Sequence, residues 1–450
     1  MTPQPTVLVR MADAGDVYMS WRWPDGTAAR GAAMLPGAAV LDAVRRLTDA
    51  LPHPEQPGGL EHAMTAGPFA ALDTEYLVAQ ALSRALLPQG LAAQLYELYR
   101  QNIRPHIRLQ PSPRVAQVPW ELLAPAPELR LIDIADISLL APAGIVQAPG
   151  RTARSWARSR REPVVAVLDP RVPGFRADSI LGSVLGRMPE DAPLTRRIAD
   201  YAAQGRLLPA VDAPTEIFRR TDLDRTWLGA TLRAGASRLV YVGHVTAAPP
   251  ESGQSEAAQL HLACTADTLG FAATDRTHRP LSAKDFLLGT HTLTTEPENG
   301  RDLWPIPSRV ALIACESGGD MRFTEALGLT AAMINGGAEL VTASRWPLPT
   351  DLAFHRLAGA PPDAHPLQQA ICAIDAAHEA DDPVTALAEW QRAQLNRWRS
   401  DGAIEHSPLL WSAFATLRAQ ARPRTVRTTV GSTPSTSSIC EMDIACTSPA

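Results

Sequence analysis

Long hydrophobic runs are absent from this chain of 450 residues. No stretch approaches the roughly 18 consecutive apolar residues that a membrane-spanning helix needs. The first residues, MTPQPTVLVRMADAG, lack the charged and then apolar pattern of a secretory signal. A hydrophobic fraction of 45% and a charged fraction of 20% are typical of a globular protein in water. We therefore expect a cytoplasmic protein with no membrane partner.

Cysteine is also scarce, and its spacing argues against two kinds of site. The cysteines are five in number, with no Cys-x-x-Cys pair: Cys264, Cys315, Cys372, Cys440 and Cys446. In a reducing compartment this pattern predicts free thiols, not a disulfide framework or a zinc site. We expect neither a metal nor another cofactor.

The chain has no excess of positive charge. Its formal net charge is -5, and Lys284 is the only lysine, which we attribute to codon bias in a GC-rich genome. Such a charge balance gives no electrostatic footprint for nucleic acid. Neither Gly-x-x-x-x-Gly-Lys-Ser/Thr nor a strand-linked Gly-x-Gly-x-x-Gly occurs, which argues against a nucleotide-binding α/β protein.

Changes in composition divide the chain into three predicted parts. Residues 1–150 predict a smaller α+β portion: TVLVRM and DVYMSWRW are typical of strands, AVLDAVRRLTDAL of a helix, and leucines recur at helical spacing over 70–100. Residues 163–417 predict a larger domain. Residues 418–450 are dense in Ser, Thr, Pro and Arg without apolar periodicity, which predicts a disordered tail.

Strand and helix patterns alternate along the larger domain. Four short apolar runs predict buried strands: PVVAVLDP (163–170), SRLVYVGH (237–244), RVALIAC (309–315) and AELVTASRW (338–346). Helical patterns at 224–236 and 323–334 lie between them. This alternation predicts a mostly parallel α/β sheet covered by helices on both faces.

Two of these strands end in residues with catalytic chemistry, His244 and Cys315. Functional groups gather beyond the carboxyl ends of parallel strands, so neighbouring strands would bring these two side chains together. The reactive form of cysteine is the thiolate, and an imidazole with the positive end of a following helix can lower the thiol pKa. On spacing alone, however, a buried packing cysteine and a merely hydrogen-bonded histidine are the commoner interpretation.

The glycines near these strand ends predict donors for a developing oxyanion. The turn Ser317-Gly318-Gly319 permits tight backbone geometry that aims N–H groups at one point. The amide of Cys315 is the first donor candidate, and backbone at Gly243 is the second.

Five ordered segments resemble the CHAT family, caspase-related (caspase/separase-like) cysteine peptidases. VPWELL (118–123) is similar to the family's Pro-Trp-Glu-Leu-Leu signature, LVYVGHV (239–245) to its His strand and VALIACESGG (310–319) to its Cys strand. GGAELVTASRWPLPTD (336–351) is similar to the Trp-Pro segment that follows, and SPLLWSAFATL (407–417) more weakly to the closing strand. The resemblance implies a caspase-like fold with His244 and Cys315 as the catalytic dyad.

The resemblance also bears on the surroundings of the dyad. In caspase-type enzymes the imidazole assists substrate and leaving group without a tight resting ion pair. Many relatives have Gly after the histidine, where an amide helps to bind the oxyanion; this chain has Val245, which can still donate its N–H but has a more restricted backbone than glycine.

Several other residues are weaker candidates for a substrate pocket. Glu316, Asp320 and Asp351 could receive a basic substrate side chain, although a solvated or helix-capping role is commoner for each. Trp120 could shape the site, but a core anchor is the commoner role for such a tryptophan.

Further residues fit bland interpretations better than functional ones. Cys264 and Cys372 are interpreted as packing thiols, and three other histidines as non-catalytic, namely His261, His278 and His291. Cys440 and Cys446 sit in the Ser/Thr-rich tail, for which plain disorder outweighs cross-linking. The basic stretch 418–427 is a candidate cleavage site.

Together these features predict a cysteine endopeptidase that cleaves a partner protein through a thioester. By resemblance, the setting would be bacterial defence or regulated proteolysis, with a separate activator or sensor protein. The alternative is a catalytically silent scaffold that keeps the fold; Val245 favours it, and retention of His244 and Cys315 opposes it.

Overall fold

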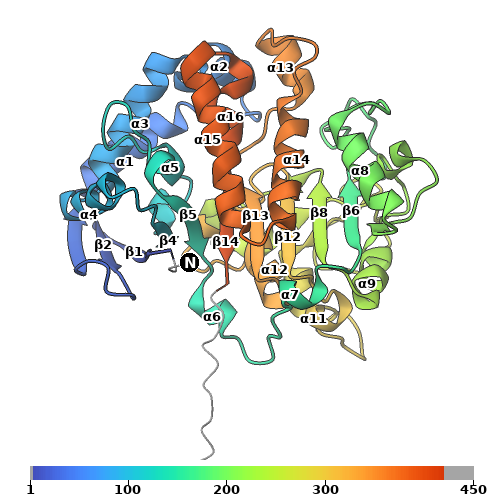
Figure 1. Ribbon diagram of the computed structural model, residues 1–450. Coiled ribbons are helices and arrows are strands. Elements are labelled where there is room, and N and C mark those ends of the chain that lie inside the picture. Colours follow the sequence, from blue (N-terminus) through green and yellow to red (C-terminus); the bar gives the residue numbers. More distant parts are fainter. Residues whose placement is uncertain (1–3, 420–450) are drawn as a thin grey trace, which may run out of the picture. The chain divides into compact units, whose positions relative to one another are not determined.

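The computed structural model describes residues 4–419, built around an 11-stranded sheet in the order β3-β2-β1-β4-β5-β14-β13-β12-β8-β6-β7. Its strand pairs are parallel except for β1–β2, β2–β3 and β13–β14. The predicted mostly parallel α/β sheet with helices on both faces is therefore confirmed (Figure 1). The predicted tail lies outside the described residues from 420 onward, and its expected first residue, Arg418, belongs to a strand instead.

All four buried strands predicted for the larger domain are present. They are β6 (Val164–Leu168), β8 (Arg238–Val242), β12 (Arg309–Ile313) and β13 (Leu340–Ser344), joined by β14 (Phe414–Arg418) and the short edge strand β7 (Leu207–Leu208). Successive residues of β6 point alternately into two hydrophobic cores: Val164 and Ala166 into one, Val165 and Val167 into the other. Burial on both faces explains why these strands are mostly apolar instead of alternating between apolar and polar residues.

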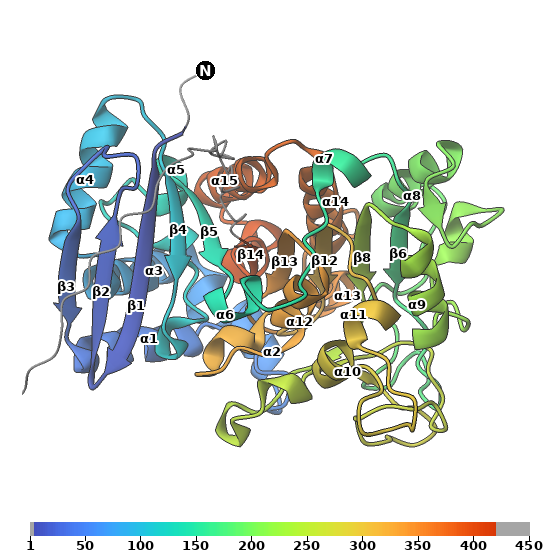
Figure 2. The same cartoon turned by 90° about the horizontal axis from the view of Figure 1, so that it is seen from below.

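Helices cover both faces of this half of the sheet (Figures 1 and 2). One face carries α8 (Pro193–Ala203), α14 (Pro366–Glu379) and α15 (Pro383–Asp401); the other carries α9 (Arg225–Ala234), α10 (Ala283–Leu288) and α12 (Leu329–Gly336). The helix predicted over 323–334 starts later, at Leu329. Gly328 precedes its first turn, and the Asp320 carboxylate accepts the Ala331 amide there, so the six residues before it are irregular.

The N-terminal portion continues the same sheet. Its strands are β1 (Thr6–Ala14), β2 (Asp16–Arg22), β3 (Gly31–Leu35), β4 (His106–Gln110) and β5 (Asp136–Leu140). Its main helices are α1 (Gly37–Thr48), α3 (Leu72–Leu86) and α4 (Gln89–Arg100), with the shorter α2 (Gly59–Thr65). The helical region expected over 70–100 is thus two helices, separated where Pro88 cannot continue the first. The sheet is continuous across the predicted division at residues 150–163, so independent folding of the two portions stays a prediction.

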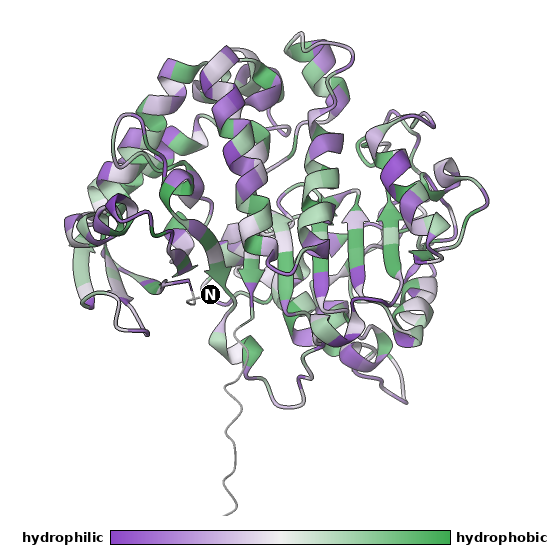
Figure 3. Ribbon diagram, viewed as in Figure 1, coloured by the Kyte–Doolittle hydropathy of each residue, from purple (hydrophilic) through white to green (hydrophobic). Residues whose placement is uncertain are grey.

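Three short strands form a separate sheet directly after His244: β9 (Val245–Thr246), β10 (Gln259–Leu260) and β11 (Leu281–Ser282). The last part of the chain adds α13 (Asp351–Leu357) and α16 (Pro408–Trp411). Figure 3 shows hydrophobic residues concentrated in the central strands and hydrophilic ones on the outer helical surfaces. No helix among residues 4–419 is both long and apolar enough to span a bilayer.

Candidate active site

His244 and Cys315 lie at the ends of neighbouring strands. β8 pairs with β12 in parallel, with Val242 opposite Ile313, and each candidate residue follows two positions later. Figure 1 shows the two strands side by side. Because paired strands lie about 4.8 Å apart, the two residues emerge from the same edge of the sheet as near neighbours. The strand pairing therefore brings the backbone at His244 and Cys315 to the same edge of the sheet.

The imidazole of His244 is half-buried and held by a backbone carbonyl. Its Nε2 lies 3.0 Å from the carbonyl oxygen of Gly182. A carbonyl only accepts hydrogen bonds, so Nε2 carries the proton and Nδ1 is the free acceptor of the neutral ring. Burial lowers the pKa of His244, and the nearby Arg219 guanidinium acts in the same direction, so the ring is neutral at pH 7.

Hydrogen bonds from the Tyr241 hydroxyl hold the backbone around His244 in place. The hydroxyl of this buried tyrosine lies 2.7 Å from the carbonyl oxygen of His244 and 2.8 Å from that of His261. A Cβ on Gly243 would lie 2.8 Å from the same hydroxyl oxygen. Position 243 must therefore be glycine, because a larger residue would collide with the Tyr241 hydroxyl.

A buried carboxylate at the next strand end anchors the loop that supplies the Gly182 carbonyl. Asp169, directly after β6, is fully buried and accepts hydrogen bonds from Ser183 Oγ at 2.5 Å and from the Val184 amide at 3.1 Å. Arg219 Nη1 bridges the two groups, 3.3 Å from Asp169 Oδ1 and 3.0 Å from the Gly182 oxygen. Asp169 was not predicted as a site residue. The available signal in the sequence was a polar residue directly after the predicted strand, in the segment PVVAVLDP (163–170).

Cys315 is half-buried, and its thiol is in a neutral resting state. Burial raises the pKa of Cys315; the Leu348 amide opposes the rise, and the Glu316 carboxylate adds to it. The expectation that the imidazole and a following helix lower the thiol pKa is wrong for this structure. The next α-helix starts only at Leu329, and desolvation disfavours the thiolate.

Hydrogen bonds to β12 and β13 fix the turn after Cys315. The Ser317 hydroxyl donates to the Leu312 carbonyl at 2.6 Å and accepts from the Ser344 amide at 3.0 Å. Glu316 takes a left-handed φ of 49°, which is uncommon for a residue with a side chain. The glycine-rich turn is thus a rigid connection and not an open loop.

The backbone amides proposed as oxyanion donors differ in whether they already donate a hydrogen bond within the protein. Within residues 4–419 the Cys315 amide has no hydrogen-bond acceptor apart from its own thiol. The amide of Gly318 donates to the Ser344 carbonyl at 2.9 Å, and that of Gly243 to the Ile313 carbonyl at 3.4 Å, so both are already engaged. Val245 lies in β9 opposite Leu260. The Cys315 amide is the donor candidate that the geometry favours.

The weaker pocket candidates fall into two groups. Asp320 is buried and caps α12, while Asp351 accepts the Leu367 amide at 2.7 Å, at the start of α14; both carboxylates therefore serve helix ends. Trp120 is buried in the core, so it does not face a substrate. Only Glu316 remains half-exposed beside Cys315, and its carboxylate pairs with Arg322 at 2.8 Å.

The Pro-Trp-Glu-Leu-Leu segment supports the site instead of lining it. Glu121 forms a buried ion pair with Arg345, whose Nη2 lies 3.0 Å from both carboxylate oxygens. The same guanidinium donates to the Phe414 carbonyl at 3.0 Å. Gln117 Nε2 donates to the Arg345 carbonyl at 3.0 Å and lies 3.4 Å from Glu316 Oε1. The structural role of Arg345 was missed because its partner is 224 positions away.

The remaining histidines and cysteines have structural surroundings. His261 and His278 are buried and hydrogen-bonded to each other at 3.1 Å, whereas His291 is half-buried and lies 3.1 Å from Asn299 Oδ1. Cys264 is buried and Cys372 half-buried, both as free thiols. Cys440, Cys446 and all of the 418–427 stretch beyond 419 lie outside the described residues. No group of three or more potential metal ligands is gathered among residues 4–419.

Comparison with known proteins adds one family match. The model of the CHAT domain matches residues 77–419, about three quarters of the chain. No curated protein matches it. Solved structures that match include two crystal structures of the Saccharomyces cerevisiae separase–securin complex, at 3.0 and 2.6 Å resolution. Each has a TM-score of 0.43 and 10% sequence identity, covering 92% of this chain and 30% of that chain. This chain therefore spans less than a third of the length of those it matches.

Proposed function

The chain belongs to the CHAT domain family, and from this premise we propose that it is a cysteine endopeptidase with Cys315 as nucleophile and His244 as proton carrier. The observation that carries the proposal is the parallel pairing of β8 with β12, which sends both residues out of one sheet edge in register. The fixed imidazole tautomer and the unengaged Cys315 amide supply the two other elements that acyl transfer needs.

The proposed reaction begins with a neutral thiol and a neutral imidazole. As the sulfur of Cys315 attacks the scissile carbonyl carbon, the thiol proton passes to Nδ1 of His244 and the carbonyl electrons form an oxyanion that faces the Cys315 amide. The oxyanion then collapses, the C–N bond breaks, and the imidazolium gives its proton to the leaving amine. Water attacks the resulting thioester, loses a proton to Nδ1 and displaces the thiol, which recovers that proton.

The neutral resting pair makes substrate geometry the controlling factor. A thiol whose pKa is raised by burial is a poor nucleophile in the free protein, so proton transfer must accompany attack. The Gly182 carbonyl stabilises the imidazolium as it forms, because Nε2–H then donates more strongly. These features favour an enzyme whose cysteine is unreactive until a substrate is aligned with it.

We infer a partner protein as the substrate and a separate protein as activator or sensor, in the cytoplasm of a bacterium. Glu316, half-exposed beside the nucleophile, is the carboxylate placed to meet a basic substrate side chain once its pairing with Arg322 is broken. Bacterial defence or another form of regulated proteolysis is the setting that the family membership suggests.

The alternative, a catalytically silent scaffold, is supported by two observations. Val245 stands where many relatives have glycine, and burial raises the pKa of the Cys315 thiol. Both would be expected if the fold had been kept for binding alone.

A thiol-directed peptide electrophile separates the two. The enzyme predicts covalent labelling of Cys315 that is lost in Cys315→Ala and strongly slowed in His244→Ala, while Cys372→Ala, the matched half-buried thiol, labels normally. A peptide-library cleavage profile with the candidate activator present then gives the substrate preference. Labelling that is equal in wild type and His244→Ala would leave the scaffold as the function.

A further inference from the structure

The outermost strand of the N-terminal portion has a free edge. β3 pairs with β2, and no other strand of the described chain pairs with it, so β3 ends the sheet at this side (Figures 1 and 2). One row of its backbone N–H and C=O groups therefore lacks a strand partner. Such a row is a template for another extended chain.

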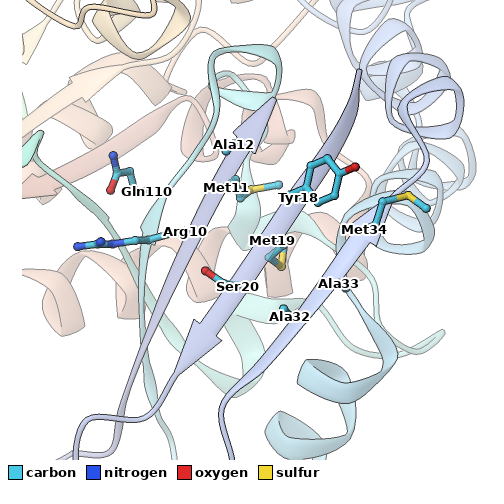
Figure 4. Close-up of a pocket in the computed structure, with 10 residues that line it drawn as sticks. All are labelled: Arg10, Met11, Ala12, Tyr18, Met19, Ser20, Ala32, Ala33, Met34 and Gln110. Carbon is cyan, nitrogen blue, oxygen red and sulfur yellow. The ribbon is translucent and has the colours of Figure 1, made fainter. Parts of the chain in front are cut away.

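One face beside this edge is both apolar and hollowed. The pairing register places Tyr18 of β2 opposite Met34 of β3, and Ser20 opposite Ala32, on the same side of the sheet as Arg10. Tyr18 and Met34 are 49% and 53% exposed. They line a hollow of about 630 Å³, shown in Figure 4, and a second hollow of about 270 Å³ adjoins it over Arg10 and Ser20.

The charged side chains on this face are all arginines, and none of them has a polar partner within the described residues. Arg10, Arg22 and Arg30 are exposed, and among residues 4–419 none of their side chains has a hydrogen bond or an ion pair. The nearby carboxylates are engaged elsewhere: Asp13 with Arg114, Asp16 with the Gly37 amide and Asp25 with Thr27. Arg22 and Arg30 thus lie at one end of this face and Arg10 beside its middle, and among residues 4–419 none of the three is paired with a carboxylate.

We propose that the β3 edge is the docking site for an extended acidic segment of a partner protein, added to the sheet as a further strand. Side chains of an added strand alternate, so every second one shares the face of Ala32 and Met34. The segment would carry a carboxylate opposite Arg30, within reach of Arg22, and apolar side chains opposite Ala32 and Met34. Carboxylate pairing with guanidinium is geometrically favourable.

Polypeptide fits this site better than other anionic partners. Only another extended polypeptide can form a regular ladder of hydrogen bonds with the free backbone row of β3, and neither nucleic acid nor a lipid surface supplies one. The formal net charge of -5 also opposes general binding to polyanions. β3 itself (Gly31–Leu35) carries no carboxylate, so a second copy paired through this strand would supply none, and an acidic partner is the better match.

Binding of a defined probe to the full chain tests the proposal. The probe is a fluorescent peptide, Glu-Thr-Glu-Thr-Val-Thr-Val-Thr, used with the same sequence in reverse order because the strand direction is open; lysine replaces glutamate in the control peptide. We expect one acidic order to bind, and hydrogen exchange to slow at the β3 amides. The double variant Arg22→Glu with Arg30→Glu should weaken binding at least about tenfold, whereas Arg45→Glu, an exposed arginine on α1, should not.

Three outcomes would overturn the proposal. The first is absence of binding by either acidic order. The second is equal binding of the lysine peptide or of the double variant, which would make the contact non-specific. The third is a dimer in sedimentation that Met34→Lys dissociates, since a second copy would then be the occupant. None of these measurements depends on peptidase activity, so the docking site and the proposed enzyme can fail separately.

Discussion

Replacing Asp169 with asparagine should release His244 from its fixed orientation. The carboxylate accepts four hydrogen bonds: Oδ1 from the Val184 amide and Arg219, Oδ2 from Ser183 Oγ and the Leu185 amide. Asparagine has the same shape but only one acceptor atom, so about half of these bonds are lost together with the charge that Arg219 faces. The loop that carries the Gly182 carbonyl then loses its anchor.

The magnitude follows from burial and from the number of bonds. A hydrogen bond to a charged group contributes about 1.5–3 kcal/mol, and the new amide group can still donate to Ser183. We therefore expect Asp169→Asn to lower the free energy of unfolding by about 2–4 kcal/mol. Asp178→Asn is the matched control: this aspartate pairs only with Arg176, both are exposed, and the change should stay within about 0.5 kcal/mol.

Two assays separate a positioning role from a purely structural one. Urea denaturation gives the stability change. Nitrogen-15 NMR of the imidazole gives the tautomer, which should shift from pure Nε2–H towards a mixture in Asp169→Asn. Where the enzyme is active, kcat should fall about ten- to a hundredfold with KM little changed, because misplacing a reacting group by about 1 Å costs this much. An unchanged His244 tautomer with unchanged stability would refute the reasoning.

Three further predictions concern other parts of the site. Glu121→Ala should lower the free energy of unfolding by about 3–5 kcal/mol in urea denaturation, because buried Arg345 loses its carboxylate; a loss below 1 kcal/mol would contradict this. Since burial raises the pKa of Cys315 above its ordinary 9.0, less thiolate exists at any lower pH, and iodoacetamide alkylation should still be accelerating at pH 9; a plateau by pH 8 would disprove it. Gly243→Ala should destabilise by about 1–3 kcal/mol in thermal unfolding, because its methyl meets a tyrosine hydroxyl, while Gly319→Ala, with open space around it, should be neutral.

The sequence predicted the fold best where burial leaves a continuous pattern. Strands β6, β8, β12 and β13 are buried at every position and mostly apolar because each contacts two cores, and this apolar pattern is visible without a structure. The helix expected at 323–334 shows the opposite case. Its first six residues have helical composition, yet a tertiary contact from Asp320 to the Ala331 amide sets a later start. Such a contact cannot be seen in a local window.

The candidate site also has parts that the sequence could indicate and parts that it could not. His244 and Cys315 could be proposed as a pair from sequence because each directly follows an apolar strand pattern, and the structure pairs those two strands. The Gly182 carbonyl that orients the imidazole could not, because it is a backbone atom in an irregular loop with no motif. The pKa of Cys315 was misjudged for a related reason: it depends on burial, which is set by packing and not by residue type.

The N-terminal portion contributes to the site through one short connection. The segment after β4 places Gln117 against the Glu316 side chain and the Arg345 carbonyl, and Glu121 against the Arg345 guanidinium. β4 pairs with β1, and β1 pairs with β2 on its other side. β2 in turn pairs with β3, the edge strand. A strand added at that edge would extend the sheet whose fourth strand, β4, leads directly into this segment. In the proposed enzyme the resting thiol and imidazole are both neutral, so small shifts in this support would act on the reaction by moving the pair and not by changing its charge.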